Sequence, residues 1–221
     1  MGIKRNILFA SALAFSVFAA PVPDCSEEQG NSTNKALLSA AKIEIIEPTT
    51  ATCDAAPFPE ECADSKTAAA ALNGSFEKYK ITAVGEVAAL VAYTLFESGN
   101  YKYKQNHYPG RPGQGTRMMA MPNYVNEYTT TVAGADAVAQ AEAAGGDAGL
   151  VAVLALANAD DQKSFGSAAW YLTTKCTPKV RAGLVAETVD GWHNFLTQCI
   201  GTTAAAERDP AWIAAKQALS Q

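Results

Sequence analysis

Glu97 is the residue of this sequence whose type and position best suit acid–base chemistry. It ends an apolar stretch, Glu86 to Glu97, and is followed at once by Ser98 and Gly99. We expect an apolar surround and the negative end of a helix dipole to act on this carboxyl group, and both effects raise a carboxyl pKa. A carboxylic acid that stays protonated near neutral pH is what a glycosidic oxygen needs from a general acid.

The segment after Glu97 is rich in tyrosine and in amide side chains. Five of the eight tyrosines lie between positions 101 and 128, interleaved with asparagine and glutamine. Aromatic rings can stack on a pyranose ring, and amides can bond sugar hydroxyl and N-acetyl groups. This pattern predicts a sugar-binding groove. The set consists of Tyr101, Tyr103, Tyr108, Tyr124 and Tyr128 with Asn100, Asn106, Asn123 and Gln114.

Two motifs in this region resemble the lysozyme superfamily. Residues Glu97 to Asn100 read Glu-Ser-Gly-Asn, and Gly115 to Pro122 read Gly-Thr-Arg-Met-Met-Ala-Met-Pro, which is similar to goose-type lysozymes and lytic transglycosylases. The Ala- and Trp-containing segment 164–171 is of a kind seen in related glycoside hydrolases. Fungal secreted muramidases are the nearest match. The chain departs from the family pattern at Arg117 and Met119, where the family has Leu and Gln.

The resemblance implies a secreted, antibacterial glycoside hydrolase that cleaves the β-1,4 bonds of peptidoglycan in the bacterial cell wall, with Glu97 as general acid. A chitinase or chitosanase using the same acid, and a non-catalytic secreted carbohydrate-binding protein, remain open as alternatives. The expected partner is peptidoglycan or another N-acetylated β-1,4 glycan, bound by a monomer. The expected substrate-binding residues are Asn100, Tyr101, Tyr103, Tyr108, Gln114, Met118, Met119 and Tyr124.

A second catalytic carboxylate is not identified by the sequence. Glu86 lies on the same helix face as Glu97, but a rise of about 1.5 Å per residue separates their backbones by roughly 16 Å. Paired carboxyl groups of glycosidases stand only about 5 to 9.5 Å apart. A mechanism with a single acid also fits, and retaining, inverting and transglycosylase outcomes stay open. The remaining carboxylates considered are Glu127, Asp136, Asp160 and Asp161.

The first residues read as a secretion signal. Residues 1–19 combine the basic pair Lys4 and Arg5, a short apolar run and small residues before Ala20. The run falls short of the roughly 20 apolar residues that span a membrane. We therefore expect a secreted protein with a signal peptide at 1–19, an N-terminal arm at 20–34 and one catalytic domain at 35–221.

Five cysteines are then expected in an oxidising compartment. Cys176 and Cys199 flank two helix-like segments and are expected to pair across a helical hairpin. Cys53 and Cys62 form the simplest second pair, although Cys25–Cys62 with a free Cys53 is equally allowed. The cysteine spacing does not suit zinc, and the chain has two histidines, so neither a metal nor a cofactor is expected.

Composition excludes further classes of partner. The net charge is −5, and removal of residues 1–19 leaves 15 basic residues against 22 acidic ones. Nucleic-acid binding needs clustered Lys and Arg, which the chain lacks, and no membrane partner is expected. His107, between Asn106 and Tyr108, is interpreted as an exposed loop histidine, with contact to the substrate as the alternative, and His193 is interpreted as a structural histidine. Asn31 and Asn73 stand in sequons that would accept glycans in a eukaryotic host.

The hydrophobic pattern predicts an all-α, lysozyme-like domain. The stretch 86–97 is apolar nearly all round, which is typical of a buried central helix. Residues 98–117 are rich in Gly, Pro, Asn and Tyr and cannot form a regular helix. Any β structure is expected only around 99–116. The other predicted helices cover about 34–45, 65–79 with a weak point at Asn73-Gly74, 135–144, 149–158, 165–175, 179–200 and 210–219.

Overall fold

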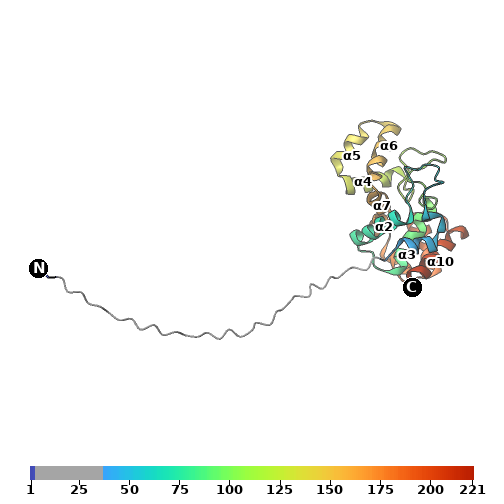
Figure 1. The fold of residues 1–221 in the computed structure, drawn as a ribbon. Helices are drawn as coiled ribbons and strands as arrows, with labels where there is room; N and C mark the ends of the chain where they lie inside the picture. The colour runs from blue at the N-terminus through green and yellow to red at the C-terminus, as the bar shows by residue number, and fades with distance from the viewer. Residues whose placement is uncertain (3–36) are drawn as a thin grey trace. The chain divides into compact units, whose positions relative to one another are not determined.

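Ten α-helices and no strands make up the fold of residues 37–221, which with residues 1–2 are the part of the chain that the computed structural model describes (Figure 1). The predicted all-α class is thereby confirmed. The predicted signal peptide at 1–19 and arm at 20–34, with Cys25 and Asn31, lie outside the described residues apart from residues 1–2. None of the described helices is long and apolar enough to cross a membrane.

The helices follow one another as α1 (Ala40–Ile46), α2 (Ser65–Tyr79), α3 (Val84–Glu97), α4 (Pro122–Ala133), α5 (Ala135–Glu142), α6 (Gly146–Ala157), α7 (Asp161–Lys175), α8 (Pro178–Val185), α9 (Val189–Asn194) and α10 (Asp209–Leu219). Two short 3₁₀ helices, η1 (Pro48–Ala51) and η3 (Ala206–Arg208), and a π-helical segment, η2 (Phe195–Ile200), connect them. Figure 1 shows α4, α5 and α6 grouped together, which agrees with their mutual contacts.

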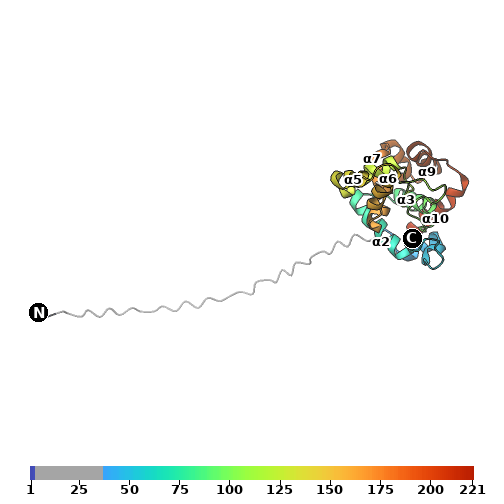
Figure 2. The same ribbon diagram turned by 90° about the horizontal axis from the view of Figure 1, so that it is seen from above.

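Helix α3 forms the centre of the domain. Its residues from Gly85 to Leu95 are all buried, and α7, α8 and α10 pack against it. Figure 2 shows α3 beside α10 in the view from above. A helix that is apolar on every face has to be surrounded, so the sequence pattern predicted this position correctly. Burial ends at Phe96 and Glu97, where the helix reaches the surface.

Helix α2 does not weaken at Asn73-Gly74, contrary to the sequence prediction. The Asn73 amide accepts a hydrogen bond from the backbone N–H of Leu38 at 3.0 Å and donates one to the Leu38 carbonyl at 2.8 Å. These tertiary hydrogen bonds offset the poor helix propensity of the Asn-Gly pair. The same contacts occupy the amide nitrogen that an N-linked glycan would need, so Asn73 has a structural role.

Two further helix predictions are wrong. Helix α4 forms where no helix was predicted, because Pro122 starts it and its inward face buries Val125 and Tyr128. The stretch 179–200, expected as one helical segment, is divided into α8, α9 and η2. The division occurs at Thr188, whose hydroxyl caps α9 by accepting a hydrogen bond from the N–H of Gly191 at 3.0 Å.

The irregular segment after α3 contains little β structure. Within the described residues it forms only isolated antiparallel bridges, between Gln105 and Gly115 and between Gly115 and Ala120. The prediction that any β structure is confined to this segment therefore agrees with the structure, where the β structure consists of isolated bridges. They hold the two ends of the loop together and bring residues 103–108 close to residues 114–119.

Two disulfides are present in the described residues: Cys176–Cys199 confirms the predicted pair, and Cys53–Cys62 is one of the two pairings that the sequence left open. Cys53 binds Cys62 with 5.9 Å between their Cα atoms, and Cys176 binds Cys199 with 5.1 Å. The second bond joins the end of α7 to η2 and encloses α8 and α9. The first bond closes the loop that carries Glu61, whose side chain contacts the wall of the candidate site.

We predict that the double variant Cys53→Ser/Cys62→Ser loses about 2 kcal/mol of unfolding free energy. The bond closes a loop with a sequence separation of 9, and such a loop restricts the unfolded chain. Urea unfolding of the variant and the wild type measures the difference. After both proteins have been reduced, the difference should disappear. Equal stability of the two oxidised proteins would contradict the prediction.

Candidate active site

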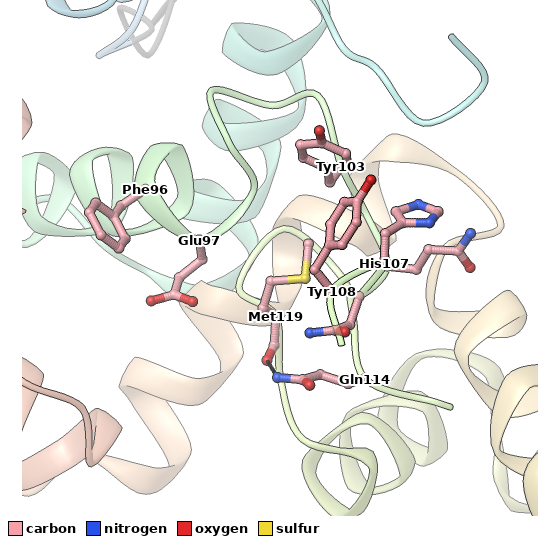
Figure 3. A pocket seen from close by; sticks show the side chains of 9 residues that line it. Phe96, Glu97, Tyr103, His107, Tyr108, Gln114 and Met119 are labelled. Carbon is pink, nitrogen blue, oxygen red and sulfur yellow. Dashed lines mark hydrogen bonds between the residues drawn. The ribbon is translucent and has the colours of Figure 1, made fainter. Parts of the chain in front are cut away.

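A pocket opens where α3 ends and the 99–121 loop folds back over it (Figure 3). Its cavity measures about 330 Å³, within the range of small-molecule sites. One wall is the end of α3 and the other is the loop, so residues far apart in the loop meet here. The lining residues are Phe96, Glu97, Tyr103, Gln105, Asn106, His107, Tyr108, Gln114 and Met119.

Glu97 is the carboxyl group of this pocket. Its Oε1 accepts a hydrogen bond from Nη1 of Arg208 at 2.8 Å, and the guanidinium of Arg208 also lies 4.0 Å from the centre of the Phe96 ring. Burial raises the pKa of Glu97, while the hydrogen bond and charge of Arg208 lower it, and the net shift is upward. The raised pKa that the sequence predicted for Glu97 is therefore confirmed, with burial as its main cause.

No second carboxylate shares this pocket. Glu86 is buried and accepts hydrogen bonds from Nε and Nη2 of Arg181 at 2.6 and 3.2 Å. That pairing gives Glu86 a structural role between α3 and α8. The other carboxylates considered from the sequence, Glu127, Asp136, Asp160 and Asp161, are absent from the pocket lining.

A buried glutamate holds the loop wall from behind. Glu61 is 2% exposed and accepts three hydrogen bonds: from the backbone N–H of Lys104 at 2.9 Å, from Nε2 of Gln105 at 2.6 Å and from Nε2 of His107 at 2.8 Å. Sequence analysis missed Glu61. The available signal was its place beside Cys62, because a disulfide fixes the backbone next to it.

Arg117 holds the same loop from its other side. Its guanidinium is 1% exposed, lies 4.8 Å from the centre of the Phe165 ring and donates hydrogen bonds to the backbone carbonyls of Tyr101 and Tyr103, both at 3.0 Å. Burial lowers the pKa of Arg117, and the charge of Asp161 partly offsets this. The arginine that departs from the lysozyme-like motif is thus a core residue that positions the loop.

The structure brings five of the predicted site residues together. Tyr103, Tyr108, Gln114 and Met119 line the pocket with Glu97. The side-chain amide of Gln114 donates a hydrogen bond to the Met119 carbonyl at 3.1 Å, which Figure 3 shows as a dashed line. Asn106, which belongs to the predicted groove set, also lines the pocket. Sequence analysis did not assign Phe96 and Gln105 to the site: Phe96 lies beside Glu97 at the end of α3, and the fold of the loop places Gln105 in the lining.

The other four predicted binding residues do not line the pocket. Tyr101 is 0% exposed and Met118 is 4% exposed, so both fill the core rather than a groove. The Asn100 side chain donates a hydrogen bond to the Thr49 hydroxyl at 3.1 Å. Tyr124 packs edge-on against an aromatic ring of α7. Their assignment as substrate contacts is therefore corrected: their neighbours are parts of the protein itself.

Comparison with known proteins yields one long similarity. The chain is 34% identical over 160 residues to the bifunctional dioxygenase–epoxy alcohol synthase of Fusarium oxysporum. The match covers 68% of this chain but only 12% of that protein. No protein-family model and no solved structure matches the chain.

This similarity overturns the resemblance to lysozymes and muramidases. The resemblance depended on two short motifs and a few aromatic residues, whereas the similarity extends over 160 residues. The relative is named as an oxidative enzyme. The predictions of a glycoside hydrolase, lysozyme-type or otherwise, and of antibacterial cell-wall degradation are therefore wrong. Over two thirds of its length, this chain is similar to one segment of a fungal dioxygenase–epoxy alcohol synthase.

Proposed function

We propose that this domain performs an acid–base step on an oxygen-bearing organic molecule, with an epoxy alcohol as the substrate class. The observation that carries the proposal is Glu97, a carboxyl group of raised pKa in a pocket that also presents amide, phenol and imidazole groups. A carboxyl group of this kind can donate a proton to a substrate oxygen. The epoxy alcohol is taken from the name of the relative, where it is the product of the synthase activity; we propose it as the molecule on which this domain acts.

The described residues offer no cluster of side chains that would hold a metal ion for the relative's dioxygenase activity. Dioxygen chemistry is carried by a cofactor or metal that the protein binds and orients. Residues 37–221 contain no group of three or more His, Cys, Asp or Glu side chains that could hold a metal ion. Both histidines are already bonded to carboxylates, His107 to Glu61 and His193 to Asp209. We derive no oxygen-transfer step for this chain.

Opening of an epoxide ring needs only a proton donor and a nucleophile. In the proposed reaction a water oxygen attacks one epoxide carbon, the C–O bond of that carbon breaks, and the epoxide oxygen takes the proton of Glu97. The oxygen that came from water then releases its extra proton, which leaves to solvent, and Glu97 takes one proton back. The product is a vicinal diol that contains the atoms of the epoxide and of one water molecule, and nothing is oxidised or reduced. Arg208 binds Oε1 of Glu97, which leaves Oε2 to carry the transferred proton.

The lining of the pocket supports this substrate class. Phe96 and Met119 offer apolar surface, and Tyr103 and Tyr108 add aromatic faces with hydroxyl groups. An epoxy alcohol combines an apolar carbon skeleton with two oxygen atoms, so it needs both kinds of contact. The Gln114 amide is held by the Met119 carbonyl and can bond an alcohol oxygen with its own oxygen atom.

We expect Glu97→Gln to slow conversion of a long-chain epoxy alcohol by about 100-fold or more, because the amide cannot supply the proton. Mass spectrometry of the product should show the addition of one water by the wild type. Glu77→Gln is the matched control, since Glu77 is exposed on α2 and does not line the pocket. Equal rates for the wild type and Glu97→Gln, or no conversion by the wild type, would contradict the proposal.

The glycan partner expected from the sequence serves as the comparison ligand. N-acetylglucosamine oligomers are titrated against the same protein by calorimetry, and the epoxy alcohol should bind more tightly. Tighter binding of the oligomers would contradict the proposed substrate class.

We also propose that the protein is exported and that residues 1–19 are removed, which the two disulfides support because such bonds persist in oxidising compartments.

A further inference from the structure

The Glu61–His107 pair is a second ionisable unit at the pocket, and the acid step at Glu97 does not use it. Nε2 of His107 lies 2.8 Å from Oε1 of Glu61. The side chain of Glu61 is 3% exposed and that of His107 is 18% exposed. The glutamate therefore lies beneath the pocket wall, while the imidazole belongs to the wall itself.

The hydrogen bonds around Glu61 fix which nitrogen of His107 carries the proton. Glu61 already accepts from the Lys104 N–H and the Gln105 amide, so its oxygens act as acceptors. Nε2 of His107 must then donate to Oε1. In the neutral imidazole this leaves Nδ1 without a proton, which makes Nδ1 the basic nitrogen.

Packing holds the imidazole ring in this orientation. The ring of Phe58 stacks on it with 3.6 Å between centroids and 5° between planes, and the ring of Tyr103 lies 5.7 Å away. Phe58 lies in the loop closed by Cys53 and Cys62. In Figure 3 Glu97 and His107 come from different walls of the pocket, one from the end of α3 and the other from the loop.

We infer that His107 is the general base that complements the acid Glu97, and that Glu61 is the residue that positions it. This inference rests on the proposed function. Nδ1 of His107 takes a proton from the attacking water as its oxygen bonds to the epoxide carbon, and Glu97 gives its proton to the departing epoxide oxygen. The protonated imidazole then loses its proton to solvent, and Glu97 regains one, so the site returns to its starting state without any change of oxidation state.

If His107 only held the loop in place, it would make the same hydrogen bond to Glu61. The test therefore has to separate this structural role from the role of general base. His107→Gln keeps an N–H donor for Glu61 and removes the basic nitrogen. We expect kcat for the epoxy alcohol to fall about 100-fold while KM changes less than about threefold. His193→Gln is the matched control, because His193 is also bonded to a carboxylate, Asp209, and lies outside the pocket lining. Its kcat should stay within about twofold of the wild type.

His107→Ala provides an independent arm in case His107→Gln does not fold. Free imidazole can enter the space left by the side chain, and we expect it to restore kcat of His107→Ala at least about tenfold. Glu61→Gln should lower kcat more than it raises KM, since it disturbs the orientation of the base rather than binding.

The outcomes distinguish the two proposals. If Glu97→Gln loses turnover while His107→Gln keeps it, the base assignment is overturned and the proposed function stands. If His107→Ala is inactive and imidazole has no effect on it, the base assignment is likewise overturned. No turnover by the wild type would overturn both.

Discussion

Gly191→Ala should lower the unfolding free energy of this domain by about 3 kcal/mol, at the upper end of what overpacking usually costs. A Cβ atom at position 191 would lie 2.0 Å from the carbonyl oxygen of Gly183 and 2.4 Å from its carbonyl carbon. These are backbone atoms, which cannot rotate away, so α8 and α9 would have to separate. Separation of the two helices would also disturb Trp192, whose ring stacks on that of Trp212 with 6.0 Å between the ring centroids.

Urea unfolding followed by tryptophan fluorescence measures this effect. Gly74→Ala is the matched control, because it also replaces a glycine inside a helix. There the new Cβ would lie 2.4 Å from Oε1 of Gln162, the far end of a flexible side chain that can move. Alanine also favours the helix by about 1 kcal/mol, so we expect a change of less than about 1 kcal/mol. Similar losses for both variants would contradict the argument.

Arg208→Met should have the second large effect, a loss of about 3 to 5 kcal/mol at pH 7, because the ionised form of Glu97 then lacks its charged partner. The side chains of Arg208 and Glu97 are 9% and 19% exposed, so solvent can replace little of the lost interaction. Methionine keeps apolar contact with Phe96, which limits the loss to the charge and its hydrogen bonds to Glu97 and Thr202.

The pH dependence of this loss has a definite sign. In the folded protein the pKa of Glu97 is raised above its ordinary value of 4.5. Such a group contributes stability that is present below the unfolded pKa and is lost as the pH rises through the folded pKa. Arg208 opposes the shift, so its removal raises the pKa of Glu97 further. Arg208→Met should therefore lose much less stability at pH 4 than at pH 7.

Urea unfolding at both pH values tests this prediction, with Arg111→Met as the control for an exposed arginine. The double variant Arg208→Met/Glu97→Gln should recover much of the loss at pH 7, since no charge is then left unpaired. A loss of equal size at pH 4 and pH 7 would show that Arg208 acts through packing alone.

The sequence by itself determined the all-α class, the buried helix around Leu90 and the place of Glu97 at its end. These features follow from the local sequence pattern. A helix that is apolar on every face belongs in the core, and the side-chain carboxyl group of Glu97, at the end of that helix, then lies at the boundary of the core. The Cys176–Cys199 disulfide was also predictable, because the two cysteines flank a helical hairpin, whereas only the structure selects Cys53–Cys62 over the equally allowed Cys25–Cys62.

Only the tertiary structure decided which groups act with Glu97. Arg208 is separated from Glu97 by 111 residues and Glu61 from His107 by 46, and no local pattern links such positions. The assignment of Tyr101 and Met118 as substrate contacts failed for the same reason, because these residues have suitable types but face the core. A site depends on the direction of each side chain, and that direction is set by the long-range packing of the loop on Glu61 and Arg117.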